Sequence, residues 1–383
     1  MKLFIFELKK YIFKPSILIC LVIFALINFV KVFEYYYYFN NGRFAIGNDA
    51  ALYSAKSELY NIYKGLINDE KIQNLQLDLT KAQQLLKEYG TGIRVEESLS
   101  GYPYGDINLI NELISDYEYA ILYTNKANDT AAAAMNNIYF FQNRSDFEIR
   151  KNTYIYNVFR DRSVNVYVKE NGWTNLFEFK FSSVLSMLMI TLAVSPVFSG
   201  EKGVGFDRLI IAAGQRKSSI QYKILSAFSF TFIVSLLFML LDMVYISAIY
   251  GLDGFTAMIY TLPTFENAPF NIRLSSALLI SFAGRLAAMC FYTSVVLLIS
   301  SLCGNSGISL ATSAAIGTVC VLLTEHLPSF LNPLSLVSMT EYFIKFEFVN
   351  IFGFPVLTLV ISFLFTILLT ITITLLAWRR AFR

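Results

Sequence analysis

The sequence predicts an all-α polytopic membrane protein with six transmembrane helices, an N-terminal interfacial helix and a mostly helical extracellular domain between the first two spans. Two observations carry this prediction. Of the 383 residues, 55% are hydrophobic and 15% are charged, with a mean hydropathy of +0.51, whereas a soluble domain carries about 25% charged residues. The apolar residues also concentrate in runs of about 20, the length of helix that crosses a hydrocarbon core of about 30 Å.

Residues 1–15 are predicted to form an amphipathic helix in the membrane interface. Wound as a helix, they separate apolar from charged residues: Phe4, Ile5, Leu8, Tyr11 and Ile12 share one face, and Lys2, Glu7, Lys9, Lys10 and Lys14 the other. This pattern is typical of helices that bind at a membrane surface. Pro15 ends this helix, and the first span is predicted at 16–38, where the tyrosines at 35–38 form an interfacial belt.

Residues 39–176 are predicted to form the extracellular helical domain. Apolar residues recur at helical spacing in two stretches: Ile72, Leu75, Leu79, Ala82 and Leu86, and then Ile110, Leu113, Tyr117 and Ile121. Such spacing predicts amphipathic helices. GYPYGD at 101–106 is predicted to be a turn, because Gly and Pro interrupt helices. A third helix is expected in SDFEIRKNTYIYNVF at 145–159.

Residues 177–383 are predicted to hold the other five spans. We place these near Phe179–Ser199, Ile224–Tyr250, Leu274–Cys303, Ile308–Glu325 and Phe354–Trp378. Ser195-Pro196 is expected to kink the first of them. The apolar stretches within 327–353 are too short and interrupted to cross, so short re-entrant helices are expected before the last span.

Basic residues predict the orientation. The first sixteen residues hold four Lys, the segment 200–223 holds five Lys and Arg, and the C-terminal tail holds three Arg, whereas the loops 251–273 and 327–353 together hold only Arg273 and Lys345. Cytoplasmic loops carry the excess of Lys and Arg. Both termini and the segment 200–223 are therefore expected in the cytoplasm, with the chain in a bacterial plasma membrane.

The segment 200–223 is the most informative part of the sequence. Its apolar residues fall at i, i+3, i+4 and i+7, which predicts a short amphipathic helix at the inner membrane surface: Phe206, Leu209, Ile210 and Ala213. An ordinary solvated basic loop is the alternative. The run Glu201-Lys202-Gly203, followed by Asp207-Arg208-Leu209-Ile210, Arg216 and Lys223, resembles the inner loop of type-2 ATP-binding-cassette (ABC) export permeases. The resemblance extends over the whole six-span plan, although many relatives have a Pro where this chain has Gly214-Gln215.

The resemblance implies that this segment is a coupling helix that binds a separate cytoplasmic ATPase. The residues implicated are Glu201, Gly203, Phe206, Asp207, Arg208, Leu209, Ile210 and Arg216. ATP and Mg would bind on that partner, and two permease chains, as a homodimer or heterodimer, would enclose the path. The chain itself is not expected to be an enzyme, because GEKGVGFD at 200–207 lacks the Gly-Lys-Ser/Thr ending of a phosphate-binding loop. Neither a metal site nor nucleic-acid binding is expected, since the only His lies beside a single Glu and the net charge is +3.

Asp242 and Arg285 are charged residues within predicted spans. At about 1.5 Å per residue, both lie about 12–16 Å from the outer ends of their helices. A lone charge there costs about 2.5–3.5 kcal/mol on insertion scales, so the two are expected to form an ion pair. The pair either fixes two helices together or lies on a substrate path.

The function predicted from these observations is outward transport of an amphipathic substrate such as a peptide, lipid or antibiotic. A sensor subunit that detects extracellular peptide or envelope stress and binds an ATPase is the alternative. Export of sodium or another ion, and secondary transport, are weaker alternatives, and no inverted repeat supports the latter.

Overall fold

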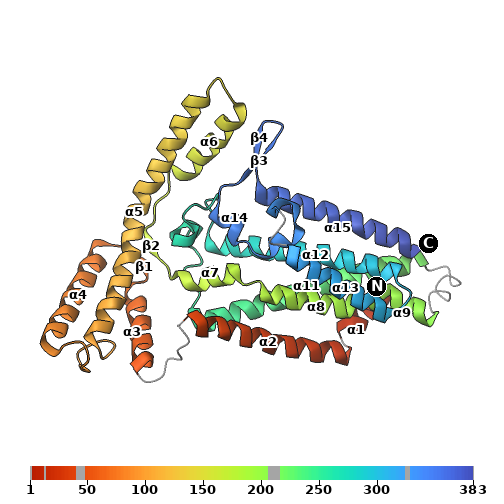
Figure 1. Ribbon diagram of the computed structural model, residues 1–383, viewed down its shortest axis with the longest axis horizontal. Coiled ribbons are helices and arrows are strands. Elements are labelled where there is room, and N and C mark those ends of the chain that lie inside the picture. Colours follow the sequence, from red (N-terminus) through yellow and green to blue (C-terminus); the bar gives the residue numbers. More distant parts are fainter. Residues whose placement is uncertain (1, 13, 40–47, 206–215, 324–327, 383) are drawn as a thin grey trace.

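The computed structural model describes residues 2–12, 14–39, 48–205, 216–323 and 328–382. Helices along the long axis form one bundle (Figure 1): α1 (Lys2–Ile12), α2 (Pro15–Phe39), α8 (Phe181–Val194), α9 (Pro196–Val204), α11 (Arg216–Tyr250), α12 (Leu274–Leu302), α13 (Ser306–Leu322) and α15 (Thr358–Phe382). At one end of the bundle lie the helices α3 (Asn48–Tyr63), α4 (Asp69–Tyr89), α5 (Pro103–Phe141) and α6 (Asp146–Phe159). Both chain termini lie toward the opposite end (Figure 1).

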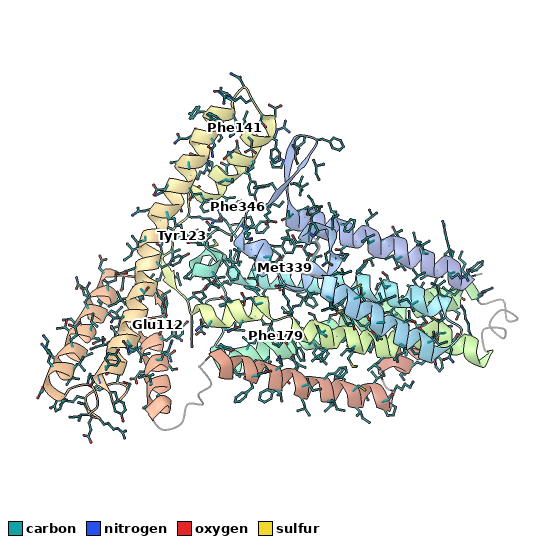
Figure 2. All side chains as sticks on the ribbon, viewed as in Figure 1. Glu112, Tyr123, Phe141, Phe179, Met339 and Phe346 are labelled. Atoms are coloured by element: carbon teal, nitrogen blue, oxygen red, sulfur yellow. The ribbon has the colours of Figure 1, made fainter. Side chains whose placement is uncertain are left out.

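Among the described residues, five helical stretches are long and apolar enough to cross a membrane: Pro15–Glu34, Glu170–Gly203, Arg216–Tyr250, Leu274–Leu302 and Thr358–Phe382. In their most apolar windows, 72% of residues are buried in the stretch that contains α8 and 56% in α12, against 17% in both α2 and α15. Helices α8 and α12 therefore lie at the centre, and α2 and α15 direct apolar side chains outward along their length (Figure 2). The chain is thus a helical membrane protein.

The predicted second span, Phe179–Ser199, is two helices rather than one, because α8 and α9 meet at Ser195, where a kink was expected. A further helix, α7 (Glu170–Glu178), precedes the predicted span and is separated from α8 by an interruption at Phe179-Lys180. The predicted domain boundary at 176 therefore falls inside α7. This helix packs closely against the end of α11, because a Cβ on Gly172 would lie 1.9 Å from the carbonyl oxygen of Gly251. Trp173, fully buried, donates from Nε1 to the carbonyl of Asp253 at 2.7 Å.

Helices α4 and α5 occupy the two stretches predicted from periodicity, and α6 occupies the third helix expected at 145–159. Asn68 accepts from the amide of Lys71 and so caps α4, and Ser145 accepts from the amide of Glu148 in a capping-box sequence at the start of α6. The predicted turn at 101–106 is wrong in its extent, because α5 already begins at Pro103. Proline is favourable at the first helical position, where its missing N–H is not needed.

The helices α3, α4, α5 and α6 are called the external helices here because they lie outside the bundle, and they contact it through the loop between α11 and α12. Arg162 is 2% exposed and donates to five acceptors around this loop: Asn271 Oδ1, Tyr123 Oη and the carbonyls of Glu266, Ala268 and Phe270. Its guanidinium also lies over the rings of Phe159 and Tyr260. Tyr123, on α5, donates in turn to the Glu266 carbonyl at 2.8 Å (Figure 2). Arg162 therefore joins the external helices to the loop, and an ion pair between Lys126 of α5 and Glu266 at 2.6 Å adds a second contact.

The segment before the last span contains a hairpin that the sequence analysis missed. Two 3-10 turns, Ser329–Leu331 and Pro333–Val337, and α14 (Thr340–Ile344) match the expected short helices. The antiparallel strands β3 (Phe348–Ile351) and β4 (Phe354–Leu357) then follow, so the last span begins at Thr358 rather than Phe354. Aromatic and β-branched residues on both sides of Phe352-Gly353 favour this hairpin over helix. A second short antiparallel pair, β1 (Gly65–Leu66) with β2 (Val166–Tyr167), joins the segment after α3 to the segment after α6.

Replacing Arg162 by Gln should destabilise the junction between the external helices and the bundle. The change leaves several buried carbonyls without a charged donor, and we expect a loss of about 3 kcal/mol in the free energy of unfolding. Thermal unfolding in detergent measures this. Arg160→Gln is the matched control, because Arg160 is exposed and its ion pair with Asp161 should contribute less than about 1 kcal/mol. Equal effects of the two variants would contradict the role of Arg162.

Candidate functional site

A buried polar network lies in the middle of the bundle around Asp242 of α11. Its side chain is 0% exposed. Oδ2 accepts from Arg285 Nη1 on α12 at 2.7 Å and from Ser182 Oγ on α8 at 2.5 Å. Oδ1 accepts from Asn28 Nδ2 on α2 at 2.8 Å. The two charges singled out in the sequence therefore form an ion pair, and a single carboxylate joins four helices.

Arg285 also binds the interruption between α7 and α8. Its Nη2 donates to the carbonyl of Phe179 at 2.5 Å, with a longer contact to the carbonyl of Leu176 at 3.4 Å. Carbonyls at the end of a helix lack intrahelical partners and carry partial negative charge. Leaving them unpaired in an apolar region is costly, so the guanidinium stabilises a break that contains neither Pro nor Gly. Asn28 and Ser182 also belong to this site, although neither was predicted from the sequence. An isolated Asn in the first apolar run was the available signal for Asn28.

Two adjoining cavities open beside this break. One, of about 550 Å³, is lined by Lys31 of α2 and by Glu178, Lys180 and Glu341. The other, of about 240 Å³, lies between α8, α13 and the 3-10 turns. Both share Lys180, Val184, Ser338 and Glu341. The second adds an apolar wall, which includes Met187, Val321 and Leu334. Together they offer charged groups of both signs next to an apolar surface.

The ends of the predicted coupling segment contact several helices at the other end of the bundle. Glu201 of α9 accepts from Lys10 of α1 at 3.1 Å and also from Lys223 of α11. Lys202 donates to the carbonyl of Ser301 on α12. Arg216 donates to the carbonyl of Ala381 on α15 at 3.1 Å. A movement of this segment would therefore act on α1, α11, α12 and α15 together.

Of the other residues assigned to the coupling helix, only Gly203 is among the described residues. Phe206, Asp207, Arg208, Leu209 and Ile210 lie outside the described residues. Gly203 lies near the start of α13, because a Cβ on it would lie 3.5 Å from the carbonyl of Gly304. Glu7 of α1 lies beside Lys10 on the charged face, as predicted, but it is only 5% exposed. Burial raises its pKa against the opposing effects of Lys10 and Lys223, because α1 packs on α11.

A set of hydroxyl groups supports the second interruption, at Ser195. Its carbonyl accepts from Ser199 Oγ at 2.8 Å, Ser300 Oγ at 2.6 Å and Ser309 Oγ at 2.8 Å. Ser300 Oγ also accepts from the amides of Phe198 and Ser199, in the first turn of α9. Helix α9 is thereby joined to α12 and α13 as well as to α8.

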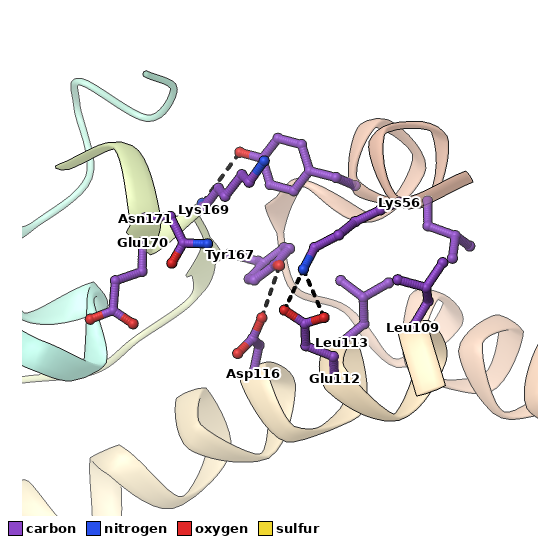
Figure 3. Close-up of a pocket in the computed structure, with 11 residues that line it drawn as sticks. Lys56, Leu109, Glu112, Leu113, Asp116, Tyr167, Lys169, Glu170 and Asn171 are labelled. Carbon is purple, nitrogen blue, oxygen red and sulfur yellow. Dashed lines mark hydrogen bonds and ion pairs between the residues drawn. The ribbon is translucent and has the colours of Figure 1, made fainter. Parts of the chain in front are cut away.

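A separate cavity of about 160 Å³ lies in the external part, between α3, α5 and the β2–α7 link (Figure 3). Lys56 contacts Glu112 at 2.6 Å, and the Tyr167 hydroxyl donates to Asp116 at 2.9 Å (Figure 3). Burial raises the pKa of Asp116 to about 6, although the Tyr167 hydrogen bond lowers it. Burial lowers the pKa of Lys169, which lies over the ring of Tyr60. This cavity could bind a small ligand that carries both charges.

No family model, curated protein or solved structure matches this chain.

Neutralising either member of the buried ion pair should destabilise the bundle strongly. Asp242→Asn leaves Arg285 without its counter-charge, and Arg285→Gln leaves Asp242 without its counter-charge and the break without its charged donor, each at a cost of about 3–5 kcal/mol. The double variant should recover part of this loss, because no isolated charge remains. Thermal unfolding in detergent measures the stability of the wild type, the two single variants and the double variant, which together form a double-mutant cycle. Additive losses in the double variant would show that the pair is not coupled.

Asp116 should make stability depend on pH. A carboxyl whose pKa is raised by folding stabilises the folded state below its unfolded pKa of 3.8, and this contribution is lost as the pH rises through about 6. The unfolding temperature of Asp116→Asn should therefore exceed that of the wild type at pH 7, with the difference shrinking toward pH 4. Glu118→Gln, an exposed change on the same helix, is the control. A pH-independent difference would contradict this assignment.

Proposed function

We propose that the chain is the membrane-spanning permease subunit of a bacterial ABC exporter, with ATP hydrolysed on a separate cytoplasmic subunit. The observation that carries the proposal is the set of contacts at the ends of the 200–223 segment. Glu201 binds both Lys10 and Lys223, and Arg216 reaches α15. A force applied to this short basic segment is thereby transmitted to four helices. An ordinary solvated loop needs no such contacts.

Six spans are part of the proposal. The two termini lie toward the same end of the bundle (Figure 1), which requires an even number of crossings, and five long apolar stretches alone would give an odd number. Helix α13 supplies the sixth. Its 17 residues extend about 25 Å at 1.5 Å per residue, slightly less than a typical hydrocarbon core. Local thinning of the bilayer accommodates such a mismatch.

The cavities beside the α7–α8 break support an amphipathic substrate: a peptide, a lipid or an antibiotic. Lys180 and Glu341 can bind charged groups of opposite sign. Met187, Val321 and Leu334 offer apolar contact to the remainder of the same molecule. We propose that two such chains, identical or related, face each other and move the substrate outward across the bacterial plasma membrane with both termini in the cytoplasm.

A sensor of extracellular peptides, coupled to the same kind of ATPase, is the second candidate. The external cavity favours it, because Asp116 and Lys169 offer both charges beside Tyr60 and Tyr167. The buried Trp173 and Arg162 then connect the external helices to the bundle. The two candidates differ in whether ATP turnover moves a substrate across a vesicle membrane.

Purification of the tagged chain from its native membrane should recover a cytoplasmic ATPase. In reconstituted vesicles, Glu201→Gln, Arg208→Glu and Arg216→Glu should each lower the rate of ATP-driven transport by about tenfold, which corresponds to about 1.4 kcal/mol in the activation free energy. Lys87→Glu and Glu96→Gln, exposed changes in the external part, should leave it unchanged. Transport by the chain alone, without an ATPase, would contradict the proposal.

A further inference from the structure

The β3–β4 hairpin ends in a bare aromatic tip. Ile351 pairs with Phe354, and Phe352-Gly353 form the two-residue turn between them, with φ angles of 51° and 83°. Such turns require positive φ at both positions and favour Asn-Gly. A phenylalanine in the left-handed region is strained, and Phe352 is the one such non-glycine residue among those described. Its side chain is 97% exposed, and those of Phe354 and Ile351 are 58% and 39% exposed.

The hairpin packs against α6 although its tip is exposed. The guanidinium of Arg150, on α6, lies 3.9 Å from the ring centre of Phe354. Farther down the hairpin, Tyr154 of α6 contacts the ring of Phe348 at 5.6 Å. Phe346, just before β3, contacts Phe159 at 5.4 Å (Figure 2). The Asn350 side chain accepts from the amide of Gly353 at 2.8 Å and closes the turn. The exposure of Phe352 is thus a property of an ordered element.

The position of the hairpin indicates that its tip lies beside the lipid bilayer. The hairpin immediately precedes α15, and the amide of Thr358 donates to the carbonyl of Glu347 at 3.0 Å across its base. It projects sideways from the end of α15 that lies far from the termini (Figure 1). Because α15 exposes most of its apolar surface, lipid lies along this side of the bundle. A segment that extends sideways here lies at the level of the membrane surface.

We propose that the tip of the β3–β4 hairpin inserts into the head-group layer of the membrane, on the side away from the termini. A phenylalanine ring has no polar group, so it is stabilised by leaving water for the boundary between head groups and acyl chains, where interfacial segments bury Phe and Leu. Phe352 enters the layer, and Arg150 beside Phe354 binds lipid phosphate. Since α6 packs on the hairpin, this contact fixes the external helices at a set height above the bilayer. The proposal depends on the chain spanning a membrane and not on the transport function.

Tryptophan fluorescence of the full chain in phosphatidylcholine–phosphatidylglycerol vesicles tests the insertion. Phe352→Trp keeps an aromatic ring at the tip, and its emission is obtained by subtracting that of the wild type, which has Trp173 and Trp378. Lipids brominated near the head group should quench this added emission by about half, and aqueous iodide should not reach it. Phe354→Trp gives the same readout from an extended backbone if the first variant fails to fold.

Leu77→Trp is the matched control, because Leu77 is 57% exposed on α4, among the external helices. Its emission should be quenched by iodide and not by brominated lipid. The proposal is overturned if the tip variants behave in the same way. It is also overturned if they are protected from both quenchers, since a second copy of the chain, rather than lipid, would then cover the tip.

Discussion

The structure of the bundle depends on one buried cation, Arg285, which must be paired with an opposite charge and hydrogen-bonded. A guanidinium in an apolar environment must be paired and hydrogen-bonded, because its desolvation costs several kcal/mol (about 2.5–3.5 on insertion scales). Asp242 supplies the opposite charge, and the carbonyl of Phe179 accepts a second hydrogen bond. Asn28 and Ser182 then donate two further hydrogen bonds to the carboxylate of Asp242. Helices α2, α8, α11 and α12 are thereby fixed in one register by a single polar network.

Two separate sets of polar contacts accompany the division of the stretch Glu170–Gly203 into α7, α8 and α9. Arg285 satisfies the carbonyls at the first interruption, and three serine hydroxyls satisfy the carbonyl of Ser195 at the second. Helix α7 carries Trp173 toward the external loop, and α9 carries Glu201 toward the basic segment. The cavities open between these two contacts, beside Lys180. In the proposed exporter, this divided span connects the coupling segment, the substrate cavity and the external helices.

The local sequence pattern was sufficient to predict α4, α5, α6 and the long spans, because helical periodicity and the length of an apolar run do not depend on distant residues. The pairing of Asp242 with Arg285 could also be predicted, since each is a charge in an apolar run. The interruption at Phe179-Lys180 could not, because it lacks Pro and Gly and is stabilised by a residue over a hundred positions away. The β3–β4 hairpin was missed because its apolar residues suit either the start of a span or a strand. The burial of Glu7 could not be predicted, because the packing of α1 against α11 is a tertiary effect.

Hydrogen exchange of the full chain in a membrane mimetic tests the central role of Arg285 most directly. If its guanidinium seals the interruption between α7 and α8, an Arg285→Met variant should lose amide protection mainly in residues 176–184. Helices α12 and α15 should keep their protection under the same conditions. Unchanged exchange in 176–184, or an equal loss of protection along all the helices, would contradict the account.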